Sequence, residues 1–477
     1  MKILLSQLQA YQKPVVGIGV TAFTRIGPVF LLPNFSVLCM LETTDLGTIR
    51  QSCPVRSLER DFKINPESLE RQNTAAIMGQ PAVSQFFQSL GSGTSLLVYK
   101  SSPKVEQICQ KLGIKILSNP AQVRDPFEDK KAFRILGQKV ELKLIPGETL
   151  LIDDLTQNKH QQLIVQYGPE LVWQLPDYKV GGGIGTLFIK SLNDYQQAMA
   201  FIQRRRQAGT NLVWVNVTKF IKGTDASISA CVTRHGILCG LVQIQLNDVA
   251  EVTAFKGRNG VWCGHDWGWK HFDSKIQKKA ENIAKTLGKF MAKKGYRGMF
   301  GIDLMIDSVG QVWPVECNAR YTAAFPAYCM MQRLYGEIPF DAFHLAEFLE
   351  IEYEDDLDVI QKLYRQPKIG AQLVLRNQTR KWVKVEGHLK GGVYQLKQGG
   401  LVWQRPGFSL QDLQAADEFC LVDRAAVHGR ILKPGERLVR VLFKGKIAVS
   451  SNQLTDWASQ VCRQIYKEYR LQVIKGK

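Results

Sequence analysis

The sequence has 477 residues and a formal net charge of +19, with 45% hydrophobic and 22% charged residues. A chain of this length is expected to form about two to four domains, and its ordinary composition excludes a fibrous or disordered protein. No run of about 18 apolar residues predicts a membrane span, and the N-terminus lacks the features of a secretory signal. Ten cysteines lie singly, without CxxC pairs, which indicates reduced thiols. We therefore expect a cytoplasmic protein.

The first 125 residues alternate strand-like and helix-like runs. A helical pattern covers residues 104–112 and ends at Gly113. Short apolar runs predict strands at 15–20, 35–41, 95–100 and 114–117. This alternation indicates an α/β domain with a mostly parallel sheet.

A glycine-rich segment follows in the middle of the chain. One predicted strand ends at Gln174, glycines occupy most of residues 181–185, and a second strand covers 186–189. Glycines allow backbone N–H groups to approach phosphates closely. The segment lacks the GxxxxGK[ST] order of a P-loop, and a glycine-rich turn without a ligand is the alternative interpretation.

A long amphipathic helix and a hairpin come next. Apolar residues recur at helical spacing over 273–294, while the lysines there fall largely on the other face. Residues 298–306 and 311–318 then form two strand-like runs separated by the turn DSVG. This pattern predicts a β-hairpin.

The predicted hairpin carries oxygen ligands. Glu316 and Asn318 share one face of a strand, and Asp303 lies on the neighbouring strand within one diagonal step. Two carboxylates and an amide oxygen suit Mg²⁺, which also takes nucleotide phosphate oxygens. Arg320 is placed to stabilise charge on a transferring phosphoryl group. A surface hairpin with exposed acids is the alternative.

The stretch 257–271 combines glycines and tryptophans with His265, Asp266 and His271. A substrate-facing loop is one interpretation, and an ordinary packed loop is the other. A metal site built from the two histidines lacks further ligands at a usual spacing.

Charge changes sign sharply near the end of the chain. Residues 337–358 hold nine acidic residues and no Lys or Arg, whereas 361–477 hold 22 Lys and Arg against 8 Asp and Glu. Strand-like runs fill this basic region, which closes with a predicted helix at 454–469. The basic region is suited to an anionic partner such as nucleic acid or an acidic peptide. The alternative is a solvated surface that packs against the acidic segment.

Several motifs occur in the order of the ATP-grasp superfamily. SLLVYKSSPKVEQICQKLGIKILSNP resembles the end of its preceding α/β domain, and FEDKKAF resembles a helix start that contacts ATP. The glycine-rich segment resembles its lid, VTKFIKGTDASIS resembles its hinge strand, and GYRGMFGIDLMIDSVGQVWPVECNAR resembles its metal hairpin. The resemblance covers roughly residues 95–330.

This resemblance implies a multidomain α/β and α+β fold. It places a pre-ATP-grasp α/β domain at 1–125 and an ATP-grasp core at 126–350. The lid subdomain would span about 155–222, and a small mixed β domain would occupy 365–477.

The resemblance also implies ligands for ATP and Mg²⁺, with Mn²⁺ as a substitute metal. Asp303, Glu316 and Asn318 would bind the metal, and Arg320 would be catalytic. The residues implied for nucleotide binding are Lys130, Gln174, Lys179, Gly181, Gly182, Gly183, Gly185, Thr218, Lys219, Phe220 and Ile221.

The implied activity is that of an ADP-forming ligase, which joins a small-molecule or peptide carboxylate to an amine through an acyl phosphate. Gln174 stands where many members have a phosphate-binding Lys, and Thr218 where many have Glu. A non-catalytic nucleotide-binding regulator or scaffold is therefore one alternative, and a nucleic-acid-binding protein is another. Ala324 and Thr322 replace the Glu and Gln of bicarbonate-using members, which disfavours a carboxylase. An acidic carrier or peptide bound by the C-terminal domain, and a homodimer, are compatible with this interpretation.

Overall fold

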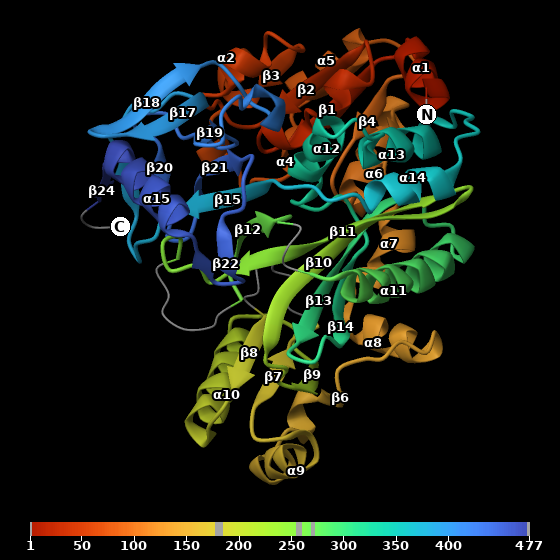
Figure 1. Ribbon diagram of the computed structural model, residues 1–477, viewed down its shortest axis with the longest axis vertical. Coiled ribbons are helices and arrows are strands. Elements are labelled where there is room, and N and C mark those ends of the chain that lie inside the picture. The colour runs from red at the N-terminus through yellow and green to blue at the C-terminus, as the bar shows by residue number, and fades with distance from the viewer. Residues whose placement is uncertain (1, 177–184, 254–259, 269–271, 475–477) are drawn as a thin grey trace.

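The computed structural model describes residues 2–176, 185–253, 260–268 and 272–474. Figure 1 shows an N-terminal domain beside a C-terminal β region, with a long curved sheet below them and a smaller lobe at the far end. Within the described residues, no helix is long and apolar enough to cross a bilayer. The ten cysteines are free and buried, as expected.

The N-terminal domain contains a five-stranded parallel sheet of order β3-β2-β1-β4-β5. Its strands are β1 Val15–Gly19, β2 Phe35–Cys39, β3 Val55–Ser57, β4 Ser95–Leu97 and β5 Lys115–Ile116. Its helices are α1 Lys2–Ala10, α2 Leu46–Ile49, α3 Leu58–Asp61, α4 Thr74–Met78, α5 Pro81–Ser89 and α6 Pro103–Leu112. Ser102 caps the start of α6, and Gly113 ends it in the left-handed conformation with φ 66°. The predicted parallel α/β layer is confirmed.

Two helices connect this domain to the lid lobe. They are α7 Ala121–Glu128 and α8 Lys130–Lys139. The side chain of Asp129 caps α8 by accepting a hydrogen bond from the Ala132 N–H. Lys130 therefore occupies the first position of that helix, as the FEDKKAF motif predicts.

The lid lobe is built on an antiparallel sheet of order β6-β9-β7-β8. Its strands are β6 Gly147–Leu151, β7 Leu171–Gln174, β8 Thr186–Ile189 and β9 Trp214–Lys219, and its helices are α9 Gln157–Tyr167 and α10 Leu192–Gln207. Since β6 pairs with β9, this sheet begins before residue 155, where the lid was predicted to start.

A ten-stranded antiparallel sheet forms the centre of the molecule, in the order β14-β13-β10-β11-β12-β15-β21-β19-β17-β18. Its first five strands are β10 Gly223–Thr233, β11 Gly236–Asn247, β12 Trp262–Asp266, β13 Gly298–Asp307 and β14 Val312–Asn318. The long helix α11 Ser274–Lys293 packs on β10 and β11 through the predicted apolar stripe. The helices α12 Phe325–Leu334, α13 Phe340–Leu349 and α14 Leu357–Tyr364 follow.

The C-terminal strands extend the central sheet, because β15 pairs with β12. They are β15 Ala371–Arg376, β17 Gly392–Lys397, β18 Gly400–Arg405, β19 Glu418–Val422 and β21 Arg437–Phe443. Smaller elements are β16 Val383–Val385, β20 Ile431–Leu432, β22 Ala448–Ser450, β23 Gln453–Leu454, α15 Asp456–Tyr469 and β24 Leu471–Val473. The predicted C-terminal β region is present, and it is continuous with the central sheet.

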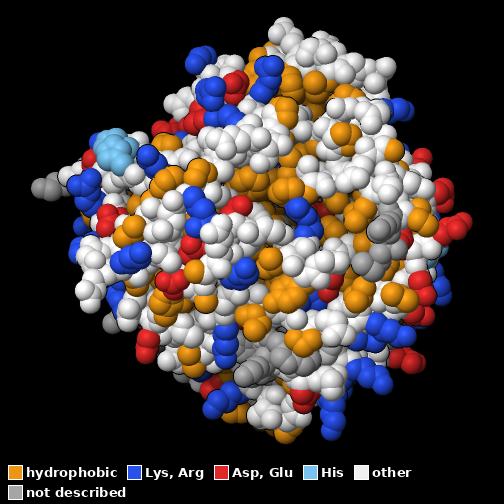
Figure 2. All heavy atoms as spheres, turned by 45° about the horizontal axis from the view of Figure 1, so that its top comes forward, with side chains coloured by type: hydrophobic (Ala, Val, Ile, Leu, Met, Phe, Trp, Pro, Cys, Tyr) orange, Lys and Arg blue, Asp and Glu red, His pale blue; other side chains and the backbone are white. Residues whose placement is uncertain are grey.

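The acidic segment 337–358 does not serve as the main partner of the basic region. Glu347 pairs with Arg234, and Glu350 pairs with Lys115. Among the described residues of 361–477, Lys368 is the one that forms an ion pair with this segment, through Glu337 at 2.5 Å. On the face that Figure 2 shows, Lys and Arg are scattered among other side chains. This distribution gives no support to a nucleic-acid surface there.

Candidate nucleotide and metal site

The hairpin β13–β14 brings its two acidic residues directly opposite each other. Asp303 pairs in register with Glu316, and Asn318 pairs with Gly301. Because paired residues of an antiparallel ladder project on the same side, both carboxylates lie on one face of the sheet. The register shifts after Asp303, so that Leu304 faces Pro314. The sequence prediction of one diagonal step from Asp303 to Asn318 is confirmed.

Asn318 and Arg320 complete the polar cluster. The Asn318 amide N–H₂ lies 3.2 Å from Asp303 Oδ2 and 3.5 Å from Glu316 Oε1. Its oxygen accepts a hydrogen bond of 2.6 Å from Arg320. Lys130 Nζ lies 3.4 Å from Glu316 Oε2. The amide oxygen therefore faces the guanidinium, and it would have to turn towards the carboxylates to bind a metal.

The pKa values of the two carboxyl groups are shifted in opposite directions when no metal is bound. Burial and the adjacent Glu316 raise the pKa of Asp303 well above its usual value. Burial also opposes ionisation of Glu316, but Lys130 and Arg320 lower the pKa of that carboxyl below its usual value. Asp303 is therefore the easier of the two carboxyl groups to protonate.

The donor set fits a magnesium nucleotide. Two facing carboxylates are hard oxygen ligands, and Mg²⁺ usually takes one or two carboxylates together with phosphate oxygens and water. Among the described residues, no third His, Cys, Asp or Glu joins them to form an all-protein cage. The close pair of carboxyl groups is itself a reason to expect a cation, since a bound metal would favour the ionised form of both groups.

The strands of the lid place the predicted nucleotide residues near this pair. Gln174 ends β7, and Thr218 and Lys219 end β9. Residues 220–222 then lead directly from the lid sheet into β10 of the central sheet. Phe220 and Phe188 from β8 form an edge-to-face contact with centroids 6.2 Å apart. The segment 218–221 is thus a connection between the two sheets, which is the position expected of a hinge strand.

One cavity of about 1250 Å³ joins these groups. Lys179, Gly181, Gly182 and Gly183 lie outside the described residues. The other predicted site residues line the cavity; they are Lys130, Gln174, Gly185, Thr218, Lys219, Phe220, Ile221, Asp303, Glu316, Asn318 and Arg320. The cavity is large enough for a nucleotide together with a second substrate.

Glu128, at the end of α7, is a site residue that the sequence did not reveal. It contacts Lys100 at 2.5 Å and Arg320 Nε at 2.9 Å. Arg124 of the same helix lies 3.5 Å from it. Glu128 lies two residues before Lys130 in the motif FEDKKAF. Its place in this motif is the sequence signal that could have identified it. It holds Arg320 beside the carboxylate pair.

The stretch 257–271 contains a strand that was not predicted. Residues 262–266 form β12, which pairs with β11 and β15, so the interpretation of this whole stretch as a loop was wrong. His265 is 4% exposed and lines the cavity, and His271 lies outside the described residues. The glycines and tryptophans obscured a strand whose partner β15 comes about a hundred residues later.

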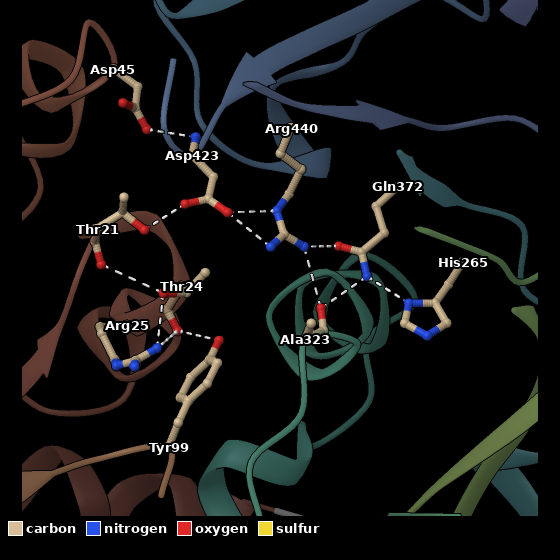
Figure 3. A network of polar contacts seen from close by, with 10 residues as sticks. All are labelled: Thr21, Thr24, Arg25, Asp45, Tyr99, His265, Ala323, Gln372, Asp423 and Arg440. Carbon is tan, nitrogen blue, oxygen red and sulfur yellow. Dashed lines mark hydrogen bonds and ion pairs between the residues drawn. The ribbon is translucent and has the colours of Figure 1, made fainter. Parts of the chain in front are cut away.

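A buried polar network fixes the cavity wall next to the hairpin. Arg440 donates to Asp423 at 2.8 and 3.0 Å, and Asp423 accepts a hydrogen bond from Thr21 of the N-terminal domain. Arg440 also donates to Gln372, whose amide N–H₂ donates to His265 and to the carbonyl of Ala323, each at 2.9 Å. Figure 3 shows this network linking the N-terminal domain, the C-terminal strands and the turn before α12. That turn follows Arg320, so the network holds the cavity wall next to the carboxylate pair.

Comparisons with known proteins identify a matching family model and solved structures of similar fold. Residues 179–324 match the model of the ATP-grasp domain. A search of curated protein sequences found no match. The biotin carboxylase domain of Hydrogenobacter thermophilus 2-oxoglutarate carboxylase, solved with MgADP, ADP and bicarbonate, has a TM-score of 0.64 at 10% identity, over 98% of this chain and 92% of that chain.

Two further solved structures show the same fold. Biotin carboxylase from Campylobacter jejuni has a TM-score of 0.61 at 12% identity, over 98% of this chain and 93% of its own. N5-carboxyaminoimidazole synthase from Aspergillus clavatus, solved with ADP and 5-aminoimidazole ribonucleotide, has a TM-score of 0.52 at 11% identity, over 95% and 97%. The fold is therefore shared over nearly the whole length of the chain.

Proposed function

We propose that the protein is an ATP-dependent ligase, because residues 179–324 match the model of the ATP-grasp domain. In this proposal it phosphorylates a carboxylate and transfers the acyl group to an amine, forming an amide or peptide bond. The observation that carries the proposal is the facing pair of Asp303 and Glu316 on the wall of the cavity that Thr218 to Ile221 also line. The solved neighbours were crystallised with ADP, which supports a nucleotide in this fold.

ATP would lie between the lid sheet and the central sheet. The connection 218–221 offers backbone groups and the Phe220 ring to the base, and Phe188 adds apolar surface. Lys130 and Lys219 supply positive charge within the same cavity for the phosphates. All the contacts proposed here for ATP come from residues that the structure describes.

Magnesium would be held by Asp303 and Glu316, and by Asn318 if its amide turns over. When bound, the ion would offset the charge that develops on the phosphates. Lys130 lies close enough to Glu316 to orient that carboxylate and then contact a phosphate oxygen. Arg320 is held by Glu128 and Asn318, so its guanidinium is already oriented before substrate binds.

The proposed reaction has two steps. An oxygen of the substrate carboxylate attacks the γ-phosphorus of ATP, the bond to the bridging oxygen breaks, and ADP leaves. The amine nitrogen then attacks the carbonyl carbon of the acyl phosphate, loses a proton, and expels inorganic phosphate. In both steps Arg320 stabilises negative charge on the phosphoryl oxygens, and the enclosed cavity limits hydrolysis of the intermediate.

The wall beside Arg320 argues against bicarbonate as the carboxylate. Ala324 is 2% exposed and lines the cavity with Thr322 and Ala323. A methyl group there cannot act as a base towards bicarbonate. The chain thus shares a fold with biotin carboxylases while lacking a titratable side chain at this position, which supports an organic carboxylate as substrate.

Gln174 favours a second candidate function, that of a nucleotide-binding regulator. An amide on the cavity wall supplies no charge to a phosphate, so ATP would be held with less electrostatic assistance. A regulator would bind Mg-ATP without releasing ADP. The intact Asp303, Glu316 and Arg320 cluster supports the ligase as the first choice.

Trapping with hydroxylamine tests the proposal. The full-length protein is incubated with Mg-ATP, pooled amino acids and small carboxylates, and hydroxylamine as the amine. We expect ADP release together with a hydroxamate whose mass identifies the carboxylate, and both should be lost in Asp303→Asn. Binding of ATP without ADP release or hydroxamate would overturn the ligase assignment in favour of the regulator.

A further inference from the structure

The cavity ends at a pair of arginines on the C-terminal strands. Arg376 of β15 pairs in register with Arg437 of β21, and both line the cavity. Arg376 donates hydrogen bonds of 3.1 Å to the carbonyls of Gly435 and Trp262. The Arg437 guanidinium lies 5.7 Å from the centre of the Trp262 ring. Two guanidinium groups therefore converge beside one tryptophan.

Asp423 favours the charged form of Arg437 and so raises its pKa, but the ion pair of Asp423 is with Arg440. Among the residues that the structure describes, neither Arg376 nor Arg437 forms an ion pair. Other arginines of the C-terminal region do so: Arg440 with Asp423, Arg424 with Glu436, Arg405 with Glu418 and Arg430 with Glu59. Arg376 and Arg437 line the cavity without such an ion pair.

The close approach of these two arginines destabilises the folded protein when no ligand is bound. Burial, together with repulsion from Arg376 and Arg424, lowers the pKa of Arg437 to about 9. Burial likewise lowers the pKa of Arg376. An anion placed between the two would relieve the repulsion and gain charge-assisted, bidentate hydrogen bonds.

His265 adds a neutral donor to the same end of the cavity. Its ring lies 5.3 Å from the Trp262 ring. Arg440 can only donate, so it fixes the oxygen of Gln372 towards itself and the N–H₂ towards His265 Nδ1. Nδ1 is therefore an acceptor, and the ring proton is on Nε2. Burial, assisted by Arg440, lowers the pKa of His265 to about 3, so the ring stays neutral.

The Nε2–H of His265 has no partner among the described residues, although the residue is 4% exposed and lines the cavity. Its hydrogen is available to an acceptor in the cavity, and the neutral ring would accept no proton from a bound anion.

We propose that Arg376, Arg437 and His265 form a subsite that binds an anionic group, a carboxylate or a phosphate, of a substrate. Calling the bound molecule a substrate depends on the proposed ligase function, but the binding of an anion at this site does not. Four strand spacings separate β13 from β15, about 19 Å when followed along the sheet. The group bound there is therefore distinct from the phosphates of ATP at Asp303, and the substrate carries this anion at a distance from its reacting atoms.

Ligand-induced stabilisation tests the subsite without turnover. The full-length protein is saturated with Mg²⁺ and a non-hydrolysable ATP analogue, which occupies the γ-phosphate position, and is then titrated with inorganic phosphate and, separately, with succinate. We expect a saturable rise in Tm of several degrees, at least halved in Arg437→Gln and in Arg376→Gln. Arg405→Gln is the matched control, because Arg405 is paired with Glu418 and does not line the cavity, and it should respond as the native protein does.

A substitution that fails to fold would be recognised from its Tm without the anion. We expect Arg437→Gln to melt no lower than the native protein, since it removes an unpaired buried charge. Arg437→Lys keeps a charge and should restore part of the response. Equal saturable responses in the native protein and Arg437→Gln, or no saturable response to either anion in the native protein, would overturn the subsite.

Turnover separates this inference from the proposed function. With the carboxylate found by hydroxylamine trapping, Arg437→Gln should raise KM for the anionic substrate at least tenfold and leave KM for ATP within twofold. Hydroxamate formation with all KM values unchanged in Arg437→Gln would overturn the subsite and leave the ligase intact. Loss of the anion response in Arg437→Gln without any hydroxamate from the native protein would support the subsite and overturn the ligase.

Discussion

Asp303 and Glu316 face each other across the β13–β14 hairpin, and the Asn318 amide bridges them at 3.2 and 3.5 Å. Two carboxylates this close cannot both ionise freely without a cation. Their position on the wall of the large cavity makes them the centre of the proposed chemistry.

Removing either charge should stop turnover. Asp303→Asn and Glu316→Gln keep the shape of each side chain but remove metal ligation, and each should lower the rate of ADP release by about a hundredfold or more. ADP release with saturating Mg-ATP measures this effect. Asp307→Asn is the control, since Asp307 ends the same strand and contacts Trp313 away from the cavity. A normal rate of ADP release in both site variants would contradict the assignment of Asp303 and Glu316 as metal ligands.

The stability of the metal-free protein should depend on the protonation of Asp303. A carboxyl group with a raised pKa in the folded state destabilises the fold above that pKa, and the loss is recovered as pH falls through it towards the ordinary carboxyl range. Asp303→Asn should therefore raise Tm at pH 8 in EDTA and change it less at pH 5. Thermal melts at the two pH values measure this. A Tm that falls equally at both would contradict a strained carboxylate pair.

Adding Mg²⁺ and ADP should reverse the order of the Tm values of the native protein and Asp303→Asn. The native protein gains ligand binding energy that the Asp303→Asn variant lacks, so the native protein should become the more stable of the two. Calorimetric titration of Mg-ADP into both proteins provides an independent measurement of the same difference.

Gln174→Lys should strengthen ATP binding. The side chain lines the cavity at the end of β7, and a cation there would contact a phosphate. An added contact of about 1 kcal/mol would lower the Kd for Mg-ATP about fivefold. Titration with Mg-ATP measures it, and Gln161→Lys on the exposed side of α9 controls for net charge. A Kd that is unchanged, or that rises, would place the phosphates elsewhere.

The Arg440–Asp423 pair should be essential for stability. Arg440 and Asp423 are almost completely buried, and Arg440→Met would leave Asp423 as an unpaired carboxylate at a cost of about 3–5 kcal/mol. Although burial raises the pKa of Asp423, Arg440 and Thr21 lower it below its usual value. The stabilisation is therefore full at neutral pH and is lost as pH falls through the ordinary carboxyl range.

Thermal and denaturant unfolding of Arg440→Met measures that loss. Arg206→Gln is the control, since its partner Asp153 is 79% exposed and the pair should contribute less than about 1 kcal/mol. The double variant Asp423→Asn, Arg440→Met should recover much of the stability. Equal stability of Arg440→Met alone and Arg206→Gln would show that the network in Figure 3 does not stabilise the fold.

The hairpin and its ligands could be predicted because their geometry is local. Residues 298–318 contain both strands and the turn, so alternation alone places Asp303 near Glu316. The helix α11, the end of α6 at Gly113 and the start of α8 at Lys130 also depend on nearby residues, through an apolar stripe and caps.

The wall formed by His265, Gln372 and Arg440 could not be predicted, because it depends on pairing between distant strands. His265 contacts Gln372 because β12 pairs with β15, and no local sequence pattern predicts that pairing. The strand β19 lacks a local signal for a different reason, since its five residues are all buried and show no alternation. The joining of the C-terminal strands to the central sheet follows from these same distant pairings.

The transfer of oxygen from the carboxylate to phosphate tests the ligase proposal most directly. Carboxylates labelled with oxygen-18 are supplied with Mg-ATP and an amine, and the inorganic phosphate released is analysed by mass spectrometry. Acyl-phosphate formation predicts that each phosphate carries one labelled oxygen and that Asp303→Asn abolishes the transfer. Phosphate released without label, in the presence of product, would contradict the proposed reaction.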